Sequence, residues 1–333
     1  MNVLILMLSD SPGIGGMEKH ARELSAGLAA KGLRVTLAGS QQHLQNLSSD
    51  VGAITINTTG SRHSPVLLLR ILRLIRSGHF DVVHAQGTKA AFVLQRLSPL
   101  IRACRLIATI HGFKSRYPKA NAFDRMIAVS KTLTESIGQP GVSVVYNGVG
   151  LPTARPVQVP KTEPPVWLAA GRLVPVKGFR KLIDAFQHCQ GSLLIAGEGP
   201  EREALQQLID ATGQQNRIHL LGHRNDLPSL MSSTDGVIIS SEREGFSYVC
   251  AEALLLGKPV IATNVPIANE LLPPQHLVDL TNPEALATCL RTPTAELLAD
   301  QNDARAIAVR DLTLNAMVEN TLNIYREVMH CEQ

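Results

Sequence analysis

The 333-residue sequence lacks the patterns that would place it in several large classes of protein. No apolar run reaches the roughly 18 residues that a membrane-spanning helix needs. The five cysteines are scattered without a C-x-x-C pair, which indicates a reduced, cytoplasmic protein. The apolar opening "NVLILML" has no basic residue before it and leads into the turn "SDSPG". We therefore expect a buried first strand there and not a signal peptide.

Common catalytic and metal-binding motifs are also missing. The sequence has no H-E-x-x-H and no His/Cys cluster at metal-ligand spacing, so we expect no catalytic metal. It has neither the G-x-S-x-G elbow of a hydrolase nor a P-loop. Hydrolysis by a nucleophilic serine and P-loop phosphate chemistry are therefore both disfavoured.

Short apolar runs alternate with helical patterns along the whole chain, which predicts parallel sheets covered by helices. The composition, 44% hydrophobic and 18% charged, is that of a globular protein, and the length suffices for two domains. We expect an α/β fold of two doubly wound domains that bind ligands at the carboxyl ends of their strands. The expected strands are residues 3–8, 34–38, 53–56, 81–84, 105–110, 125–129 and 142–146, followed by "VWLAAG", "SLLIAG", "RIHLLG", "GVIIS" and "PVIAT".

The segment "LPTARPVQVPKTEPP" separates the two halves. It holds five prolines and no periodicity, which is typical of a linker. We expect a first domain over residues 1–152, a linker over 153–165 and a second domain over 166–312. A closing helix over 313–333 is expected to pack back on the first domain.

Charge is divided unequally between the halves. Residues 1–150 carry 17 Lys and Arg against 7 Asp and Glu, a net charge of +10, whereas residues 151–333 carry 15 against 21, a net charge of −6. The first half is therefore expected to face an anionic partner. The alternative is a solvated basic surface without a special role.

Cations and glycines follow several of the expected strands. The loop "GRLVPVKG" puts Arg172 and Lys177 beside a helix start, where they would bind a diphosphate or stand as surface cations. The loop "GIGG" follows the first strand and lets backbone N–H groups approach an anion. The loop "GEGPERE" lacks the third glycine of a dinucleotide-binding turn, which favours a plain tight turn. The second strand ends in "LAGSQQH" without the acidic residue of a nicotinamide site, so hydride transfer is disfavoured.

Three further side chains are candidates for chemistry. His111, in "ATIHGF", ends a strand and precedes a glycine, so its ring is expected at the ligand-binding edge, although a lone histidine is usually structural. Glu244 and Glu252 stand in "EREGFSYVCAEALLLGKPVIAT", with seven residues between them. Burying an unpaired carboxylate costs on the order of several kcal/mol, so both should meet a ligand or a donor.

In their order and spacing these motifs resemble the retaining glycosyltransferases of family 4, which have the GT-B fold of two Rossmann-like domains facing across a cleft. The resemblance covers nearly the whole chain. It rests on "GIGGMEKHARELSAGLAAKG", "DVVHAQG", "ATIHG", "MIAVS", "YNGV", "GRLVPVKGF", "LLIAGEGPERE" and the stretch from "LLGHRND" to "GKPVIAT".

The resemblance implies a role for each candidate. Glu244 would hold hydroxyls of the donor sugar, Glu252 would accept from the ribose hydroxyls of the nucleotide, and His111 would lie beside the donor sugar. Other implied donor contacts are Arg172 and Lys177 on the departing diphosphate, Gly15 and Gly16 from the first domain, and the N–H groups of Gly245, Phe246 and Ser247, which are expected to begin a helix.

Some positions depart from the family's pattern. Tyr146 stands where proline is usual, Gln86 where a second histidine is common, and Val176 where Glu or Gln is usual. The loop "TNVPIANELL" lacks the paired glycines often found there. None of these departures removes a charged group from the implied donor site.

The activity implied by the resemblance is a retaining, metal-independent transfer of a hexosyl or N-acetylhexosaminyl group. The donor would be a nucleotide-sugar co-substrate, a UDP-sugar before a GDP-sugar, and the acceptor a cell-envelope glycan or glycolipid, with lipopolysaccharide core first. Exopolysaccharide or O-antigen transfer and nucleotide-sugar epimerisation are the alternatives. A non-enzymatic glycan-binding protein is disfavoured because it would be expected to lose Glu244, Arg172 or Lys177. No further cofactor and no nucleic acid partner are expected, and the oligomeric state stays open.

The stretch "SPVLLLRILRLIRSGHF" places Arg70, Arg73 and Arg76 on one side of a leucine-rich helix. Such a helix either packs on the core with a solvated basic face or lies on anionic lipid. The family includes peripheral membrane enzymes with basic first domains, which favours a cytoplasmic protein bound to the inner face of the membrane.

Overall fold

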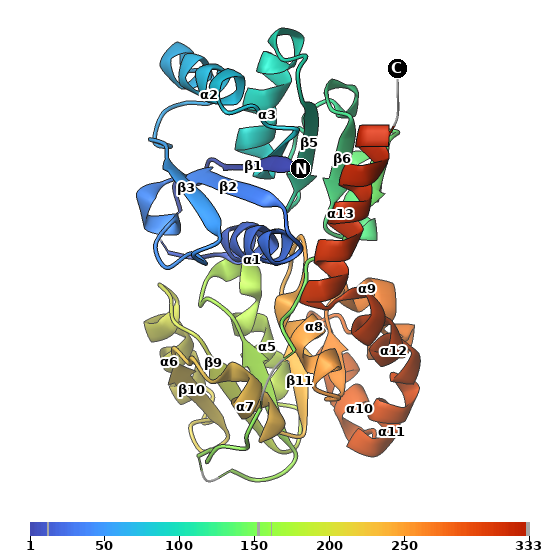
Figure 1. Cartoon of the computed structure of the whole chain (residues 1–333). Coiled ribbons are helices and arrows are strands. Elements are labelled where there is room, and N and C mark those ends of the chain that lie inside the picture. Colours follow the sequence, from blue (N-terminus) through green and yellow to red (C-terminus); the bar gives the residue numbers. More distant parts are fainter. Residues whose placement is uncertain (12, 152–153, 161, 331–333) are drawn as a thin grey trace. The chain divides into compact units, whose positions relative to one another are not determined.

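The computed structural model of the chain describes residues 1–11, 13–151, 154–160 and 162–330. It divides the chain into two compact units (Figure 1). The first unit holds Met1–Gly148 and the final helix α13 (Leu314–His330), and the second holds Val149–Leu312. Each unit has its own parallel sheet and its own hydrophobic core. The predicted α/β fold of two doubly wound domains is therefore confirmed.

A seven-stranded sheet forms the centre of the first unit, in the order β3-β2-β1-β4-β5-β6-β7, with every neighbouring pair parallel. The strand order reverses between β1 and β4, where Met7 pairs with Gln86. Doubly wound sheets bind their ligands at such a reversal. The strands are β1 (Asn2–Met7), β2 (Arg34–Gly39), β3 (Val51–Thr55), β4 (Val82–Gln86), β5 (Arg105–Ile110), β6 (Arg125–Ala128) and β7 (Val142–Val144).

Helices cover this sheet. They are α1 (Gly16–Ala30), α2 (Pro65–Ser77), α3 (Gly87–Leu97), α4 (Lys131–Ile137) and α13, with the short turns η1 (Gln41–His43), η2 (Ser98–Leu100) and η3 (Ala120–Ala122). Helix α1 has an apolar face on which Ala21, Leu24 and Leu28 are fully buried. Helix α13 lies beside α1 (Figure 1), and Gly27 permits this contact, since a Cβ there would lie 2.3 Å from Cγ2 of Val318.

The second unit is built on a five-stranded parallel sheet in the order β10-β9-β8-β11-β12. Its order reverses between β8 and β11. The strands are β8 (Val166–Ala170), β9 (Ser192–Ala196), β10 (Ile218–Gly222), β11 (Gly236–Ile239) and β12 (Val260–Ala262). The helices are α5 (Phe179–Phe186), α6 (Arg202–Ala211), α7 (Leu227–Ser232), α8 (Tyr248–Leu255), α9 (Ala268–Leu271), α10 (Pro283–Arg291), α11 (Thr294–Asp300) and α12 (Asn302–Asp311), with the turns η4 (Pro175–Lys177) and η5 (Pro274–His276).

The proline-rich segment lies within the second unit, and the boundary between the units falls before it, at Gly148 and Val149. Its described residues form neither helix nor strand. The backbone N–H of Arg155 donates to Ser229 Oγ at 3.3 Å, and that of Val157 donates to Ser233 Oγ at 2.7 Å. These bonds fasten the segment to α7 and to the residue that follows it. Residues 153 and 161 of the predicted linker, and residue 152 at the end of the predicted first domain, lie outside the described residues.

Candidate functional site

Two predicted site residues meet at the strand reversal of the second unit. Lys177, at the end of η4, donates from Nζ to Oε1 of Glu244 at 2.8 Å. The same carboxylate oxygen accepts from Ser241 Oγ. The Lys177 side chain is 22% exposed and that of Glu244 is 9% exposed, so the ion pair lies at the edge of the core with some access to solvent. The structure thus joins a cation and a carboxylate that the sequence predicted separately.

Backbone contacts between two loops fix this ion pair. The N–H of Glu242 donates to the carbonyl of Val176 at 2.9 Å, and Ser240 Oγ donates to the carbonyl of Lys177 at 2.7 Å. Gly178 has a φ of +68°, and a Cβ there would lie 2.1 Å from the Ser240 carbonyl oxygen. Only glycine fits this position, because any side chain would force the two loops apart.

A cavity of about 370 Å³ opens at the carboxyl ends of β8, β9 and β10. Each of the three loops contributes a polar side chain: Arg172 follows β8, Glu198 follows β9, and His223 follows β10. Arg172 is exposed and has no salt-bridge partner among the residues that the structure describes. A cation of this kind at a strand end is suited to an anionic ligand.

Helix α8 supplies another wall of the cavity through Val249. Glu252 lies three residues further along α8, and residues at this spacing are neighbours on one helical face. Glu252, which is predicted to bind the ribose, therefore lies next to Val249, which lines the cavity. His223 and Arg224 also line the cavity and were not predicted, although "LLGHRND" places polar residues directly after an apolar run. Arg224 is held by Asp226 through two hydrogen bonds of 2.8 and 2.6 Å.

The "GEG" turn holds the Arg172 loop in place. A Cβ on Gly197 would lie 1.8 Å from the carbonyl oxygen of Gly171, and one on Gly199 would lie 2.4 Å from that of Leu173. The N–H of Leu173 also donates to the carbonyl of Glu198 at 2.9 Å. These glycines thus serve a close approach of two backbones, as the interpretation of "GEG" as a tight turn allows.

The expectation that Gly245, Phe246 and Ser247 begin a helix is wrong. Helix α8 begins at Tyr248, and Ser247 is its N-cap residue. Phe246 is buried and packs edge to face on Tyr248, with ring centroids 5.1 Å apart, so its side chain anchors the loop and delays the helix. The hydroxyl of Ser247 is buried and forms no hydrogen bond with any described residue, so it is available to a ligand.

In the first unit, His111 directly follows β5 and Gln86 ends the neighbouring strand β4. Nε2 of His111 lies 2.7 Å from Oε1 of Gln86. Its Nδ1 is buried and has no hydrogen-bond partner within the described part of the chain. His20 of α1 packs edge-on against the His111 ring, with centroids 4.7 Å apart.

Burial keeps the histidines of this region neutral. It lowers the pKa of His20 to about 4 and that of His84 to about 3, and it lowers the pKa of His111 well below the ordinary value of 6.5. All three folded-state values lie below neutrality, so each ring carries one proton at pH 7. His111 is therefore a neutral hydrogen-bonding group and not a cation.

Gly15 and Gly16 lie at the start of α1. The N–H of Gly15 donates to Oε2 of Glu18 at 3.0 Å, and a Cβ on Gly15 would lie 2.8 Å from that oxygen. Burial alone would raise the pKa of Glu18, but hydrogen bonds from Ser9, from its own backbone and from Ser11 lower it overall, so the carboxylate is ionised. The contact of Gly15 and Gly16 with a diphosphate stays a prediction, and the Gly15 N–H is already bonded.

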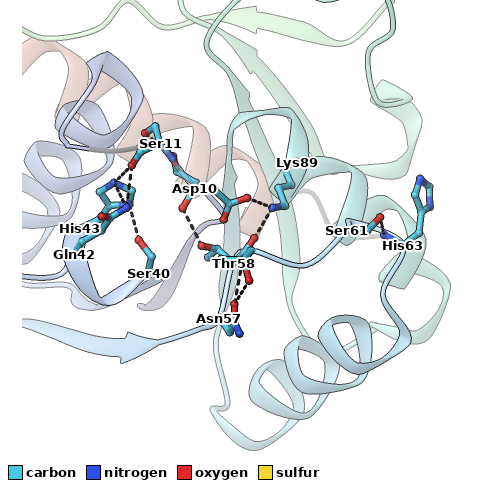
Figure 2. A network of polar contacts seen from close by, with 12 residues as sticks. Asp10, Ser11, Ser40, Gln42, His43, Asn57, Thr58, Ser61, His63 and Lys89 are labelled. Atoms are coloured by element: carbon cyan, nitrogen blue, oxygen red, sulfur yellow. Dashed lines mark hydrogen bonds and ion pairs between the residues drawn. The ribbon is translucent and has the colours of Figure 1, made fainter.

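A network of polar contacts joins the loops after β1, β2 and β3 (Figure 2). Lys89, in the first turn of α3, contacts the Asp10 carboxylate and the Thr58 carbonyl, and Thr58 Oγ1 donates to the Ser9 carbonyl at 2.9 Å. His43 Nε2 lies 3.1 Å from the Ser11 carbonyl oxygen. The network fixes the loops at the edge of the sheet where a ligand would bind.

Within the described residues, the structure contains no group of three or more His, Cys, Asp or Glu side chains that could hold a metal ion. Over the same residues, no helix combines the length and the apolar character needed to cross a membrane.

Comparison with known protein families gives a continuous match. A model of the glycosyl transferases group 1 matches residues 152–308, and a model of Glycosyltransferase Family 4 matches residues 14–151. Together they account for residues 14–308. The chain therefore belongs to the group 1 glycosyltransferases, with a first half of the family 4 type.

Two curated relatives are about a quarter identical to this chain over the aligned residues. The lipopolysaccharide core biosynthesis glycosyltransferase LpsD of Rhizobium meliloti (strain 1021) is 27% identical over 211 residues, which are 60% of this chain and 59% of LpsD. The chain thus spans about three fifths of the length of LpsD. The O-antigen biosynthesis glycosyltransferase WclY of Escherichia coli is 24% identical over 283 residues, which are 75% of this chain and 80% of WclY.

Among solved structures, HepE of Anabaena in complex with UDP is similar over 98% of this chain and 100% of its own, with a TM-score of 0.79 and 23% sequence identity. At this identity the likeness concerns the fold alone. The predicted fold class, GT-B with two Rossmann-like domains, is confirmed.

Proposed function

We propose that the protein is a retaining glycosyltransferase that moves a sugar from a nucleotide diphosphate to a cell-envelope glycan or glycolipid. The observation that carries this proposal is the Lys177–Glu244 ion pair at the strand reversal, beside a cavity that contains Arg172. A cation next to a carboxylate suits a donor whose diphosphate is anionic and whose sugar offers hydroxyl groups.

Arg172 and Lys177 would neutralise the departing diphosphate, so that no metal ion is required. Both described contacts of Glu244, with Lys177 and Ser241, use Oε1, and Oε2 accepts no hydrogen bond from the residues that the structure describes. This second oxygen is free to accept from hydroxyls of the donor sugar. His111 would accept from another hydroxyl through Nδ1, which is buried and unpartnered over the same residues.

The cavity beside Arg172 would hold the nucleoside, with Glu252 of α8 on the ribose. The complex of HepE with UDP favours a UDP-sugar over a GDP-sugar. During transfer the bond between the sugar C1 and the phosphate oxygen breaks and a bond from C1 to the acceptor oxygen forms on the same face. The acceptor hydroxyl gives its proton to the leaving phosphate. The charged and hydrogen-bonding groups would stabilise the oxocarbenium-like sugar, and no enzymic nucleophile is needed.

Lipopolysaccharide core is the acceptor that we favour, since LpsD acts in its biosynthesis. An O-antigen acceptor is the alternative, with WclY as its support. The loops that Figure 2 shows at the edge of the first unit, tied together through Lys89 and His43, would position this acceptor. Exopolysaccharide transfer and nucleotide-sugar epimerisation lack a comparable observation.

Helix α2 supports a membrane-bound acceptor. Its buried face consists of Leu67, Ile71, Leu72 and Ile75, so the exposed face carries Arg70, Arg73 and Arg76. Val66 and Leu69 share the exposed side and are 77% and 48% exposed. A face that mixes arginines with apolar side chains suits the surface of an anionic bilayer. We propose that the protein is cytoplasmic and docks on the inner membrane face through α2.

Removing either cation is expected to slow turnover. Lys177→Ala and Arg172→Ala should each lower kcat by about two or more powers of ten, on the order of 3 kcal/mol of transition-state stabilisation. Slow hydrolysis of a panel of nucleotide sugars measures this effect. Lys181→Ala is the matched control, because Lys181 pairs with Glu242 on the surface and should leave turnover unchanged. Near-normal turnover of both site variants would contradict the assignment.

Loss of Glu252 and loss of Glu244 should have different effects. Glu252→Ala is expected to weaken binding of free UDP about tenfold or more, because hydrogen bonds to the ribose are made before and after transfer alike. Glu244→Ala should act mainly on turnover with the sugar attached. Calorimetry with UDP, together with the hydrolysis rate of the intact nucleotide sugar, distinguishes the two roles. UDP affinity untouched by loss of Glu252 would rule out the ribose contact.

Activity is expected to survive an excess of EDTA, since Arg172 and Lys177 supply the positive charge that a divalent ion provides in other transferases. The measurement is donor turnover before and after chelation, with buffer exchange as the control. Activity lost with EDTA and restored by Mn²⁺ or Mg²⁺ would overturn metal independence.

Docking on lipid should depend on the α2 arginines. Each arginine near the surface contributes about 1 kcal/mol and is screened by salt, so replacing Arg70, Arg73 and Arg76 together with glutamine should abolish most sedimentation with anionic vesicles. UDP affinity should not change. A control with Arg180, Arg291 and Arg310 replaced removes the same charge from the second unit. If the α2 variant pellets like the parent, or the parent binds neutral vesicles equally, α2 is a solvated helix.

A further inference from the structure

A chain of buried side chains connects α13 to His111 within the first unit. The Tyr325 hydroxyl lies 2.7 Å from Nδ1 of His84, and Nε2 of His84 lies 3.3 Å from Nε2 of Gln86. Oε1 of Gln86 lies 2.7 Å from Nε2 of His111. Tyr325 and His84 are fully buried and Gln86 is 1% exposed. We call these four residues the imidazole relay.

The relay allows only certain proton positions. Both imidazoles are neutral and carry one N–H each, as their lowered pKa values require, and burial raises the pKa of Tyr325, so its hydroxyl keeps its proton. The Gln86 amide nitrogen can only donate, so Nε2 of His84 must accept and its proton lies on Nδ1, facing the Tyr325 oxygen. The hydroxyl of Thr109, 2.7 Å from the same Nε2, donates to it as well.

The proton position on His111, at the other end of the relay, is determined in the same way. The Gln86 amide oxygen can only accept, so His111 must carry its proton on Nε2. Nδ1 of His111 is then left with a lone pair, and this atom is buried without a partner among the described residues. A buried acceptor without a donor is unfavourable, and a ligand hydroxyl would satisfy it.

We propose that Gln86, His84 and Tyr325 are positioning residues that hold His111 in the tautomer with the proton on Nε2, so that Nδ1 accepts from a hydroxyl of the sugar. The identity of the hydroxyl rests on the proposed function. The tautomer does not, because it follows from contacts within the first unit.

Loss of the Tyr325 hydroxyl should reach His111 through the imidazole relay. In Tyr325→Phe, the N–H on Nδ1 of His84 loses its acceptor, while a proton on Nε2 still finds Thr109 Oγ1. His84 should move its proton to Nε2, and the Gln86 amide should then turn its oxygen toward His84. His111 would face an amide donor and shift its own proton to Nδ1. Removing one hydroxyl on α13 thus changes the ligand-facing atom of His111.

Nitrogen NMR of ¹⁵N-histidine-labelled protein tests the relay, because the two ring nitrogens give different shifts in each tautomer. The His111 signals are assigned by their loss in His111→Gln. The parent should hold the proton on Nε2, and Tyr325→Phe should move most of the population to Nδ1. Thr321→Val is the matched control: it removes a buried hydroxyl of the same helix that bonds to the Met317 carbonyl, and it should leave His111 unchanged.

Gln86→Ala provides a second, independent test. Without the amide, Tyr325→Phe should no longer affect His111, so the double variant should match Gln86→Ala alone. A parent with its proton on Nδ1, or a His111 tautomer that stays the same in Tyr325→Phe, overturns the proposal. Because Tyr325→Phe removes a single oxygen, it tests the relay even if Gln86→Ala does not fold.

Donor hydrolysis distinguishes failure of the relay from failure of the proposed function. Tyr325→Phe and Gln86→Ala should lower kcat about tenfold, the loss of roughly one hydrogen bond, with UDP affinity unchanged. If the His111 tautomer responds as expected but the protein hydrolyses no nucleotide sugar, the relay is supported and the proposed transferase function is refuted. If the protein hydrolyses a nucleotide sugar but the His111 tautomer does not change in Tyr325→Phe, the relay is refuted and the proposed function is supported.

Discussion

Parallel pairing of the strands is the constraint on which both candidate regions depend. In a parallel sheet all carboxyl ends lie at one edge, so loops that are distant in sequence converge there without any specific attraction between them. Lys177 and Glu244 are 67 positions apart, yet they meet because β8 and β11 are neighbours in the sheet. His111 and Gln86 meet for the same reason on β5 and β4.

Convergence of the loops alone does not hold two side chains at hydrogen-bonding distance. In the second unit, backbone contacts between the loops hold them there. Gly178 and Gly197 let neighbouring loops approach to distances that a Cβ would prevent. The Lys177–Glu244 pair retains some exposure, and partly exposed pairs of this kind contribute little net stability. Its value lies in orientation: each partner keeps the other pointed toward the strand ends, where a ligand would bind.

The sequence predicted the strands well because short apolar runs that end at glycine or polar residues seldom form anything other than buried strands. It also singled out Lys177, Glu244 and His111 as candidates, and all three lie in segments that connect a strand to the next helix. It could not find the pairing of Lys177 with Glu244, which depends on strand order. Nothing local marks Tyr325 as a partner of His84, since 241 positions separate them and Tyr325 resembles any apolar residue of an amphipathic helix. The start of α8 was missed because burial of Phe246 overrides its local helical pattern.

In the first unit, the charges at the carboxyl ends of the strands differ from those on the outer surface. The histidines at the strand ends are neutral, Lys89 is paired with Asp10, and Glu18 adds a negative charge at the start of α1. The net charge of +10 in residues 1–150 therefore does not arise from this part of the edge. It must come from other faces, and the exposed arginines of α2 are one such place. The basic character of the first half is thus a property of outer surfaces such as the exposed face of α2, and not of the region around its histidines.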